Sequence, residues 1–334
     1  MDIVKVLTEL NTSFGPSGCE APVREKVAEL ARPFADEIYT DVMGNLIAVK
    51  KSGKKNAPRL MFAAHMDSIG LIVTYIEESG LLRFGAVGGV NARNILATPV
   101  RFENGAVGTI GMDEDAKAPE IDKMFIDIGA ASRKDAEKYV KCGDMAVYDT
   151  PVRALGDGSV VSPYLDNRAG CAAQLLAMEA LKKPVFDCYF VFTVQEEVGL
   201  RGAKPATYGI APQYAIVCDG TLTDDIPWTS HIGTSKIGLG ASIKVMDKSV
   251  ICHPEMVEAL RAVAAKKKIK AQTDVLKQGG TDGSEMRKSA SGVYTGGVSV
   301  PMRYVHTPQE LSRVSDIEDC GKLMAAFAET RPEF

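Results

Sequence analysis

A run of apolar and β-branched residues that ends close to two adjacent glutamates constrains this fold more than any other stretch. The run covers residues 185–194, and Glu196 and Glu197 follow it one residue later. A strand that is hydrophobic on both faces is typical of the centre of a sheet covered by helices. Ligands of open α/β sheets bind at the carboxyl ends of such strands. One carboxylate there can hold a metal while the other moves a proton, although an isolated Glu-Glu pair is more often a solvated loop.

Other predicted strands also end in side chains that can bind a metal. These are residues 59–64 before His65 and Asp67, residues 214–218 before Asp219, and residues 293–300 before His306. A single histidine after a strand is usually an ordinary loop residue. His65-x-Asp67 is a stronger candidate, because a metal-bound imidazole needs a nearby carboxylate to orient it. His306 stands directly before Thr307 and Glu310, a spacing that predicts a capped helix start.

Asp166 has two interpretations that the sequence leaves open. Residues 162–182 pass from a polar loop into a strongly helical stretch, and Asp166 lies where that helix begins. A helix N-cap would by itself explain an aspartate at this position. The same side chain could instead bind metal beside the other candidates.

Together the candidates form a plausible set of metal ligands: His65, Asp166, Glu197, Asp219 and His306. Two imidazoles and three carboxylates suit zinc, cobalt or manganese better than calcium or copper(I). If one carboxylate bridges two ions, each ion also receives one imidazole and one terminal carboxylate. Two divalent ions minus three carboxylates leave one positive charge, which suits a bridging hydroxide and predicts a hydrolytic centre.

Residues 70–160 have a different pattern of predicted secondary structure from the chain on either side. Short β-like runs separated by glycines replace the alternation of strands and helices, which resumes afterwards. This pattern predicts an α/β fold with a helix-covered mixed sheet, formed by residues 1–69 and 161–334, and an inserted small β-rich domain at 70–160. An inserted domain of this kind usually serves binding or assembly.

Composition narrows the classes of partner and the cellular location. The net charge of −4 gives no general attraction to nucleic acid or to anionic membranes. The sequence lacks a long uninterrupted apolar segment, so we expect a cytoplasmic protein without a membrane partner. Its seven cysteines include no CxxC pair and are expected to be reduced core thiols.

Five motifs in their order along the chain resemble the tetrahedral, dodecameric aminopeptidases with two metal ions. They are AHMDSIG (64–70), SPYLDNRAG (162–170), VQEEVGLRGA (194–203), CDG (218–220) and RYVHTPQE (303–310). This family includes glutamyl, leucyl and lysyl aminopeptidases, and some members carry an endoglucanase label. The resemblance extends over essentially the whole chain, including the insert, and implies a homo-oligomer, a dodecamer by analogy.

The resemblance also implies a role for each candidate residue. One metal would be bound by His65, Asp166 and Asp219, and the other by Asp166, Glu197 and His306. Glu196 would be the general base and Asp67 would orient His65. The enzyme would then release amino-terminal residues from peptides, with two divalent ions in each subunit, zinc being favoured over cobalt or manganese.

Two departures from the family pattern and several alternatives stand beside this interpretation. Ser68 occupies a position where an acidic residue is more usual, and the family's proline-histidine segment is absent from residues 112–123. Alternatives are a metal-dependent deacylase or carboxypeptidase on the same core, a glycosidase, and a non-catalytic assembly protein. A glycosidase would work without metal, and a non-catalytic protein would be expected to lack a ligand or the base.

Overall fold

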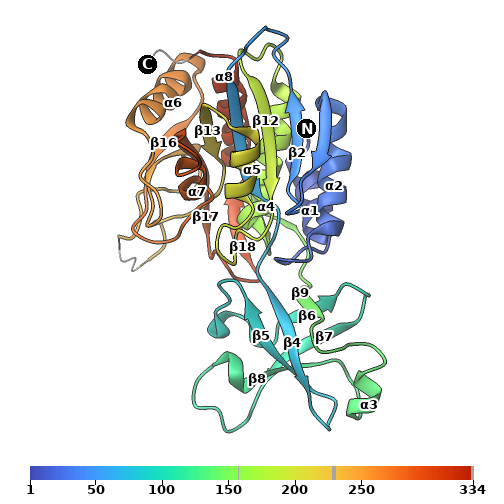
Figure 1. Cartoon of the computed structure of the whole chain (residues 1–334). Coiled ribbons are helices and arrows are strands. Elements are labelled where there is room, and N and C mark those ends of the chain that lie inside the picture. The colour runs from blue at the N-terminus through green and yellow to red at the C-terminus, as the bar shows by residue number, and fades with distance from the viewer. Residues whose placement is uncertain (157, 228–230, 332–334) are drawn as a thin grey trace.

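A mixed sheet of twelve strands forms the larger part of the molecule (Figure 1). The computed structural model describes residues 1–156, 158–227 and 231–331. Along the main path of the sheet the strands are β1 (Glu37–Thr40), β2 (Leu46–Lys50), β12 (Asp187–Thr193), β3 (Arg59–His65), β13 (Tyr214–Val217), β17 (Tyr294–Arg303), β18 (Glu310–Arg313), β11 (Ser159–Ser162) and β10 (Arg153–Leu155). Off this path lie β14 (Gly220–Leu222) and β15 (Ala241–Met246), which pair with β17, and β16 (Ala271–Val275), which pairs with β15.

Helices cover both faces of this sheet. One face packs against α1 (Ile3–Thr12), α2 (Ala21–Ala31), α4 (Leu165–Ala180), α6 (Pro254–Lys267) and α8 (Val314–Ala328), and the other against α5 (Ala203–Ile210) and α7 (Gly283–Arg287). Successive side chains of a strand point to opposite faces. Phe62 of β3 therefore belongs to the first core and Met61 to the second. Burial on both sides explains why the central strands are apolar along most of their length, and it confirms the predicted α/β class.

The parallel strands place several loops at one edge of the sheet. β12 and β13 flank β3 and run parallel to it, and β17 runs parallel to β13. The register aligns Thr193 with His65, so the loops that follow β12 and β3 leave the sheet at the same level. Residues after the carboxyl ends of these strands consequently meet at a common edge.

The inserted β-rich segment is a closed barrel that lies beyond this edge of the sheet (Figure 1). Its strands, in barrel order, are β4 (Gly70–Ile76), β5 (Leu82–Val87), β8 (Met124–Asp127), β7 (Val107–Met112), β6 (Pro99–Phe102) and β9 (Met145–Tyr148). A separate core fills it, including Leu71, Val100 and Ile126. Short helical turns complete the chain: η1 (Arg32–Phe34), η2 (Ala92–Asn94), η3 (Ile121–Lys123) and α3 (Arg133–Ala136). After β9 the chain returns to the large sheet through β10 and β11.

The described helices include none with the length and apolar character needed to cross a membrane. The seven cysteines are free thiols, and five of them are buried. Cys171 and Cys218 show the predicted core placement, because both belong to the hydrophobic cluster beneath α4. The prediction of core placement is wrong for Cys142, which is exposed, and for Cys19, which is only partly buried.

Candidate metal centre and active site

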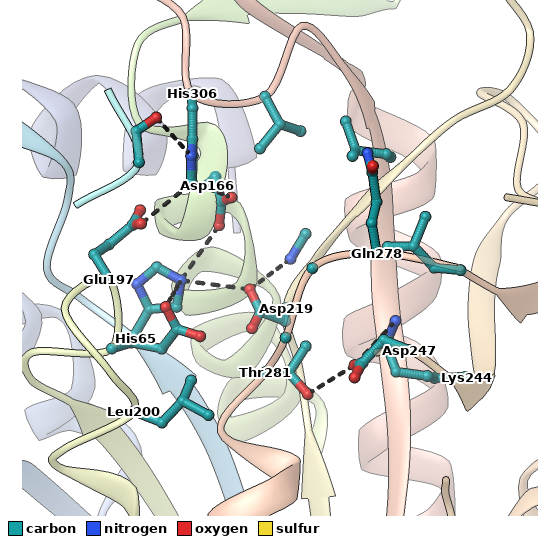
Figure 2. Close-up of a pocket in the computed structure, with 18 of the residues that line it drawn as sticks. His65, Asp166, Glu197, Leu200, Asp219, Lys244, Asp247, Gln278, Thr281 and His306 are labelled. Carbon is teal, nitrogen blue, oxygen red and sulfur yellow. Dashed lines mark hydrogen bonds and ion pairs between the residues drawn. The ribbon is translucent and has the colours of Figure 1, made fainter. Parts of the chain in front are cut away.

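The structure brings all five predicted metal ligands together at the edge where the parallel strands end. His65 ends β3, Glu197 follows β12, Asp219 follows β13, Asp166 lies in the first turn of α4 and His306 follows β17. They line one side of a cavity of about 550 Å³. Figure 2 shows their side chains converging, with a separate group of polar residues on the opposite wall.

Asp166 occupies the middle of this cluster. Its Oδ1 lies 3.3 Å from His65 Nε2, and its Oδ2 lies 3.5 Å from His306 Nε2. The N-cap position of α4 belongs to Tyr164, and Asp166 itself has non-helical backbone angles. One carboxylate thus faces both imidazoles, which favours the metal interpretation of Asp166 over the helix cap.

Each imidazole also meets a second carboxylate of its own. His65 Nε2 lies 3.4 Å from Asp219 Oδ1, and His306 Nε2 lies 3.2 Å from Glu197 Oε2. Every acidic partner is at least mostly buried, with side-chain exposures of 4% for Glu197 and 13% for Asp166. The site therefore contains two histidine–carboxylate pairs, His65 with Asp219 and His306 with Glu197. Asp166 lies between the two pairs and faces both histidines.

Asp67 acts on more than the histidine it was predicted to orient. His65 Nδ1 lies 3.2 Å from the Asp67 backbone oxygen and 3.6 Å from its Oδ1. The two carboxylate oxygens of Asp67 accept hydrogen bonds from the backbone N–H groups of Glu196 and Glu197, at 3.1 and 3.3 Å. Ser17 donates to the same carboxylate at 2.6 Å. Asp67 therefore fixes the turn that presents both glutamates.

Glu310 corrects one prediction from the sequence. It begins strand β18 rather than a capped helix, so the Thr307/Glu310 helix start is wrong and His306 lies between two strands. The buried carboxylate of Glu310 accepts from the backbone N–H of His306 and from that of Asp166, each at 2.8 Å. The acidic residue four positions after the histidine was a usable signal, but helix capping offered an equally good account of it. Glu310 thus positions two predicted ligands through their backbones.

The electrostatics of the cluster favour a bound cation. Burial disfavours a charged imidazole, but the carboxylates outweigh it, raising the pKa of His306 to about 12 and that of His65 well above its usual value. Burial also raises the pKa of the Glu197 and Asp219 carboxyls, against the opposing effect of the histidines. Glu197 Oε1 is buried and has no hydrogen-bond partner among the described residues. Metal ions bind neutral imidazole and ionised carboxylate, so this donor set fits divalent cations.

The carboxylate of Glu196 lies near the same cluster but farther from His65 than the carboxylates of Asp166 and Asp219 do. Candidate ligand atoms of His65, Glu196 and Asp219 lie within 4.8 Å of one another, as do those of His65, Asp166 and Glu197. The first grouping would make Glu196 a ligand rather than a base. However, Glu196 Oε2 is 3.9 Å from His65 Nε2, whereas the nearest Asp166 and Asp219 oxygens are at 3.3 and 3.4 Å. The two aspartates are therefore the nearer carboxylate partners of His65.

The opposite wall of the cavity contains charged residues that the sequence did not single out. Lys244 Nζ is fully buried and lies 2.7 Å from Asp274 Oδ2 and 3.7 Å from Asp247 Oδ2. Thr281 donates its hydroxyl to the same oxygen of Asp247 at 3.2 Å (Figure 2). The available signal in the sequence was a lysine flanked by apolar residues. Its acidic partners could not be identified from that signal, because they lie 3 and 30 residues further along the chain. Among the residues that the structure describes, this cavity is lined by one lysine, whose ammonium faces two carboxylates.

Comparison with known proteins agrees with the resemblance. Residues 44–323 match the M42 glutamyl aminopeptidase family. A relative in Acetivibrio thermocellus, provisionally named an aminopeptidase, is 46% identical, with 97% of each chain covered. The structure of an aminopeptidase of Desulfurococcus kamchatkensis superposes with a TM-score of 0.94 at 38% identity, covering 99% of this chain and 95% of that one. The TET1 peptidase of Pyrococcus horikoshii, which can assemble into a tetrahedron or a large octahedral shell, gives 0.88 at 33% identity over 98% and 99% of the two chains.

Proposed function

This chain belongs to the M42 glutamyl aminopeptidase family, and we propose that it releases amino-terminal residues from peptides with the aid of two divalent metal ions. The observation that carries the proposal is the position of Asp166 between His65 and His306, each of which has a further carboxylate partner. His65, Asp166 and Asp219 would hold one ion, and Asp166, Glu197 and His306 the other. Zinc, cobalt and manganese all suit this mixture of imidazole and carboxylate.

Divalent ions held by these residues would polarise the scissile carbonyl and lower the pKa of the attacking water. Glu196 is the proposed general base, because its buried carboxylate lies beside the cluster but farther from His65 than the aspartates do. It would take a proton from the attacking water and deliver it to the amine that leaves. Burial raises the pKa of Glu196 well above its usual value, which makes its carboxylate a stronger acceptor of the proton from water.

Assembly into a homo-oligomer, with the barrel mediating subunit contact, is a second part of the proposal. The barrel has its own core and extends away from the catalytic sheet (Figure 1). The TET1 peptidase, which shares this fold over nearly its entire length, can assemble into a tetrahedron or a large octahedral shell. We propose a comparable assembly here, with a dodecamer as the expected form and the cytoplasm as the expected location.

A panel of aminoacyl chromogenic substrates tests the proposed activity. We expect hydrolysis that stops on chelation and returns with zinc, cobalt or manganese, and that requires a free α-amine. Matched N-acetylated substrates provide the control, since a deacylase or carboxypeptidase would not need the free amine. Activity toward glucans that survives chelation would favour the glycosidase alternative instead.

A further inference from the structure

We propose that the inserted barrel helps to build the metal centre, by way of the Gly88–Gly89 turn that positions His306 and Glu197. The inference rests on the two-metal function proposed above, and it adds a role for the barrel that is distinct from assembly. Gly88 and Gly89 directly follow β5 of the barrel, yet Gly89 lines the catalytic cavity. The turn is closed by a hydrogen bond from Val90 N to Gly88 O at 3.0 Å.

The carbonyl of Gly89 lies where it would select one tautomer of His306. His306 Nδ1 is 3.2 Å from Gly89 O, while Nε2 faces Asp166 and Glu197. A carbonyl oxygen only accepts hydrogen bonds, so this contact requires the proton on Nδ1. In the neutral imidazole that a metal binds, Nε2 is then left with a free lone pair directed at the cluster, and a hydrogen bond of this kind also fixes the ring orientation of a metal ligand.

The absence of side chains in this turn leaves room for both ligands. A Cβ at Gly89 would collide with the Nδ1 and Cε1 atoms of His306. A Cβ at Gly88 would lie 3.2 Å from the Cβ of Glu197, and Gly88 also has a left-handed φ of +78°. The two ligands beside the turn are those assigned to the second ion alone. The barrel should therefore affect that ion more than the ion held by His65 and Asp219.

The chain that leaves the barrel holds the His306 loop from another direction. Thr150, two residues after β9, donates its hydroxyl to the backbone oxygen of Pro308 at 2.9 Å. Glu310 accepts from the backbone N–H of His306 at 2.8 Å. The loop is thus restrained by the barrel turn at the imidazole, by the barrel's exit at Pro308 and by β18 at the backbone.

The decisive variant is Gly89→Ala in the full-length protein, with Gly85→Ala as its matched control. Neither glycine has a left-handed φ, and a Cβ at Gly85 would make only ordinary contacts of 3.5 and 3.6 Å within the barrel. Zinc content after dialysis and calorimetric titration of the metal-depleted proteins would be measured, with melting temperatures and the visible spectrum of the cobalt-loaded forms. We expect Gly89→Ala to keep one tight ion and to bind the second roughly 10–100-fold more weakly, while Gly85→Ala matches the unaltered protein.

Equal affinity for the second ion in Gly89→Ala and Gly85→Ala would overturn the inference while leaving the two-metal function intact. A single ion in the unaltered protein would overturn both. If Gly89→Ala does not fold, Thr150→Val decides, because it keeps the side-chain shape and removes only the hydrogen bond to Pro308. Selective weakening of the second ion in Thr150→Val supports the role of the barrel, and unchanged binding of both ions contradicts it.

Discussion

Replacing Glu196 by glutamine is expected to separate proton transfer from metal binding. The amide preserves the size of a side chain that is 10% exposed, so the folded structure and its thermal stability should be almost unchanged. Because the nearest Glu196 oxygen is 3.9 Å from His65 Nε2, we expect both ions to remain bound. An amide cannot accept the proton, so kcat should fall by roughly 10²–10⁴. That loss corresponds to about 3–5 kcal/mol of transition-state stabilisation.

Glu197→Gln is the natural partner of this variant, since it makes the same chemical change one residue away. Glu197 Oε2 lies 3.2 Å from His306 Nε2 and its other oxygen is buried without a partner, so the amide should weaken the second ion. Activity should partly return at high metal concentration. Metal analysis beside steady-state kinetics of both purified variants compares the two roles. Equal metal loss in the two variants, or normal turnover in Glu196→Gln, would show that the base has been assigned to the wrong residue.

Four further outcomes are expected from the site and the barrel. Asp166→Asn should sharply lower metal content while changing the melting temperature little, because the Asp166 carboxylate faces both imidazoles rather than capping α4; full metal content and activity would contradict this. Light scattering on the intact protein should give the mass of many subunits, and a strict monomer would exclude assembly through the barrel. The aminoacyl panel should favour basic over acidic first residues, because Lys244 is already paired with Asp274 at 2.7 Å and the Asp247 carboxylate also lines the cavity. Lys244→Met should strengthen this preference, and an unchanged preference would remove this wall from substrate selection.

The ligand-bearing edge could be predicted because the central strands carry an unambiguous pattern. Burial on both faces makes β12 and β3 largely apolar after the charged residue that begins each strand, so a later change to acidic residues or histidine marks the end of each strand. Parallel strands bring such ends together irrespective of their distance in sequence. The convergence of Glu197 and His65 followed from these two regularities.

The supporting contacts were less accessible to sequence reasoning. Glu310 fitted a helix-capping pattern, and only the pairing of β18 with β11 reveals that its carboxylate reaches Asp166, 144 residues earlier. The contact between Gly89 and His306 joins residues 217 positions apart in the sequence. It uses a backbone carbonyl, which every residue type has, so the residue types do not reveal it. The partnership of Lys244 with Asp274 depends in the same way on how β15 and β16 pair. Interactions of this kind are set by register and loop path, which local periodicity does not determine.

The pairing of β11 with β18 limits where the chain can accept insertions or deletions. Ser162 lies opposite Glu310 in this antiparallel pair, and Asp166 follows only four residues after Ser162. A register slip of one residue would turn Glu310 to the opposite face of the sheet. The backbones of both His306 and Asp166 would then lose their shared acceptor in a single step. Insertions or deletions near this pair should therefore abolish function outright, whereas equal changes in the outer hairpins of the barrel should be tolerated.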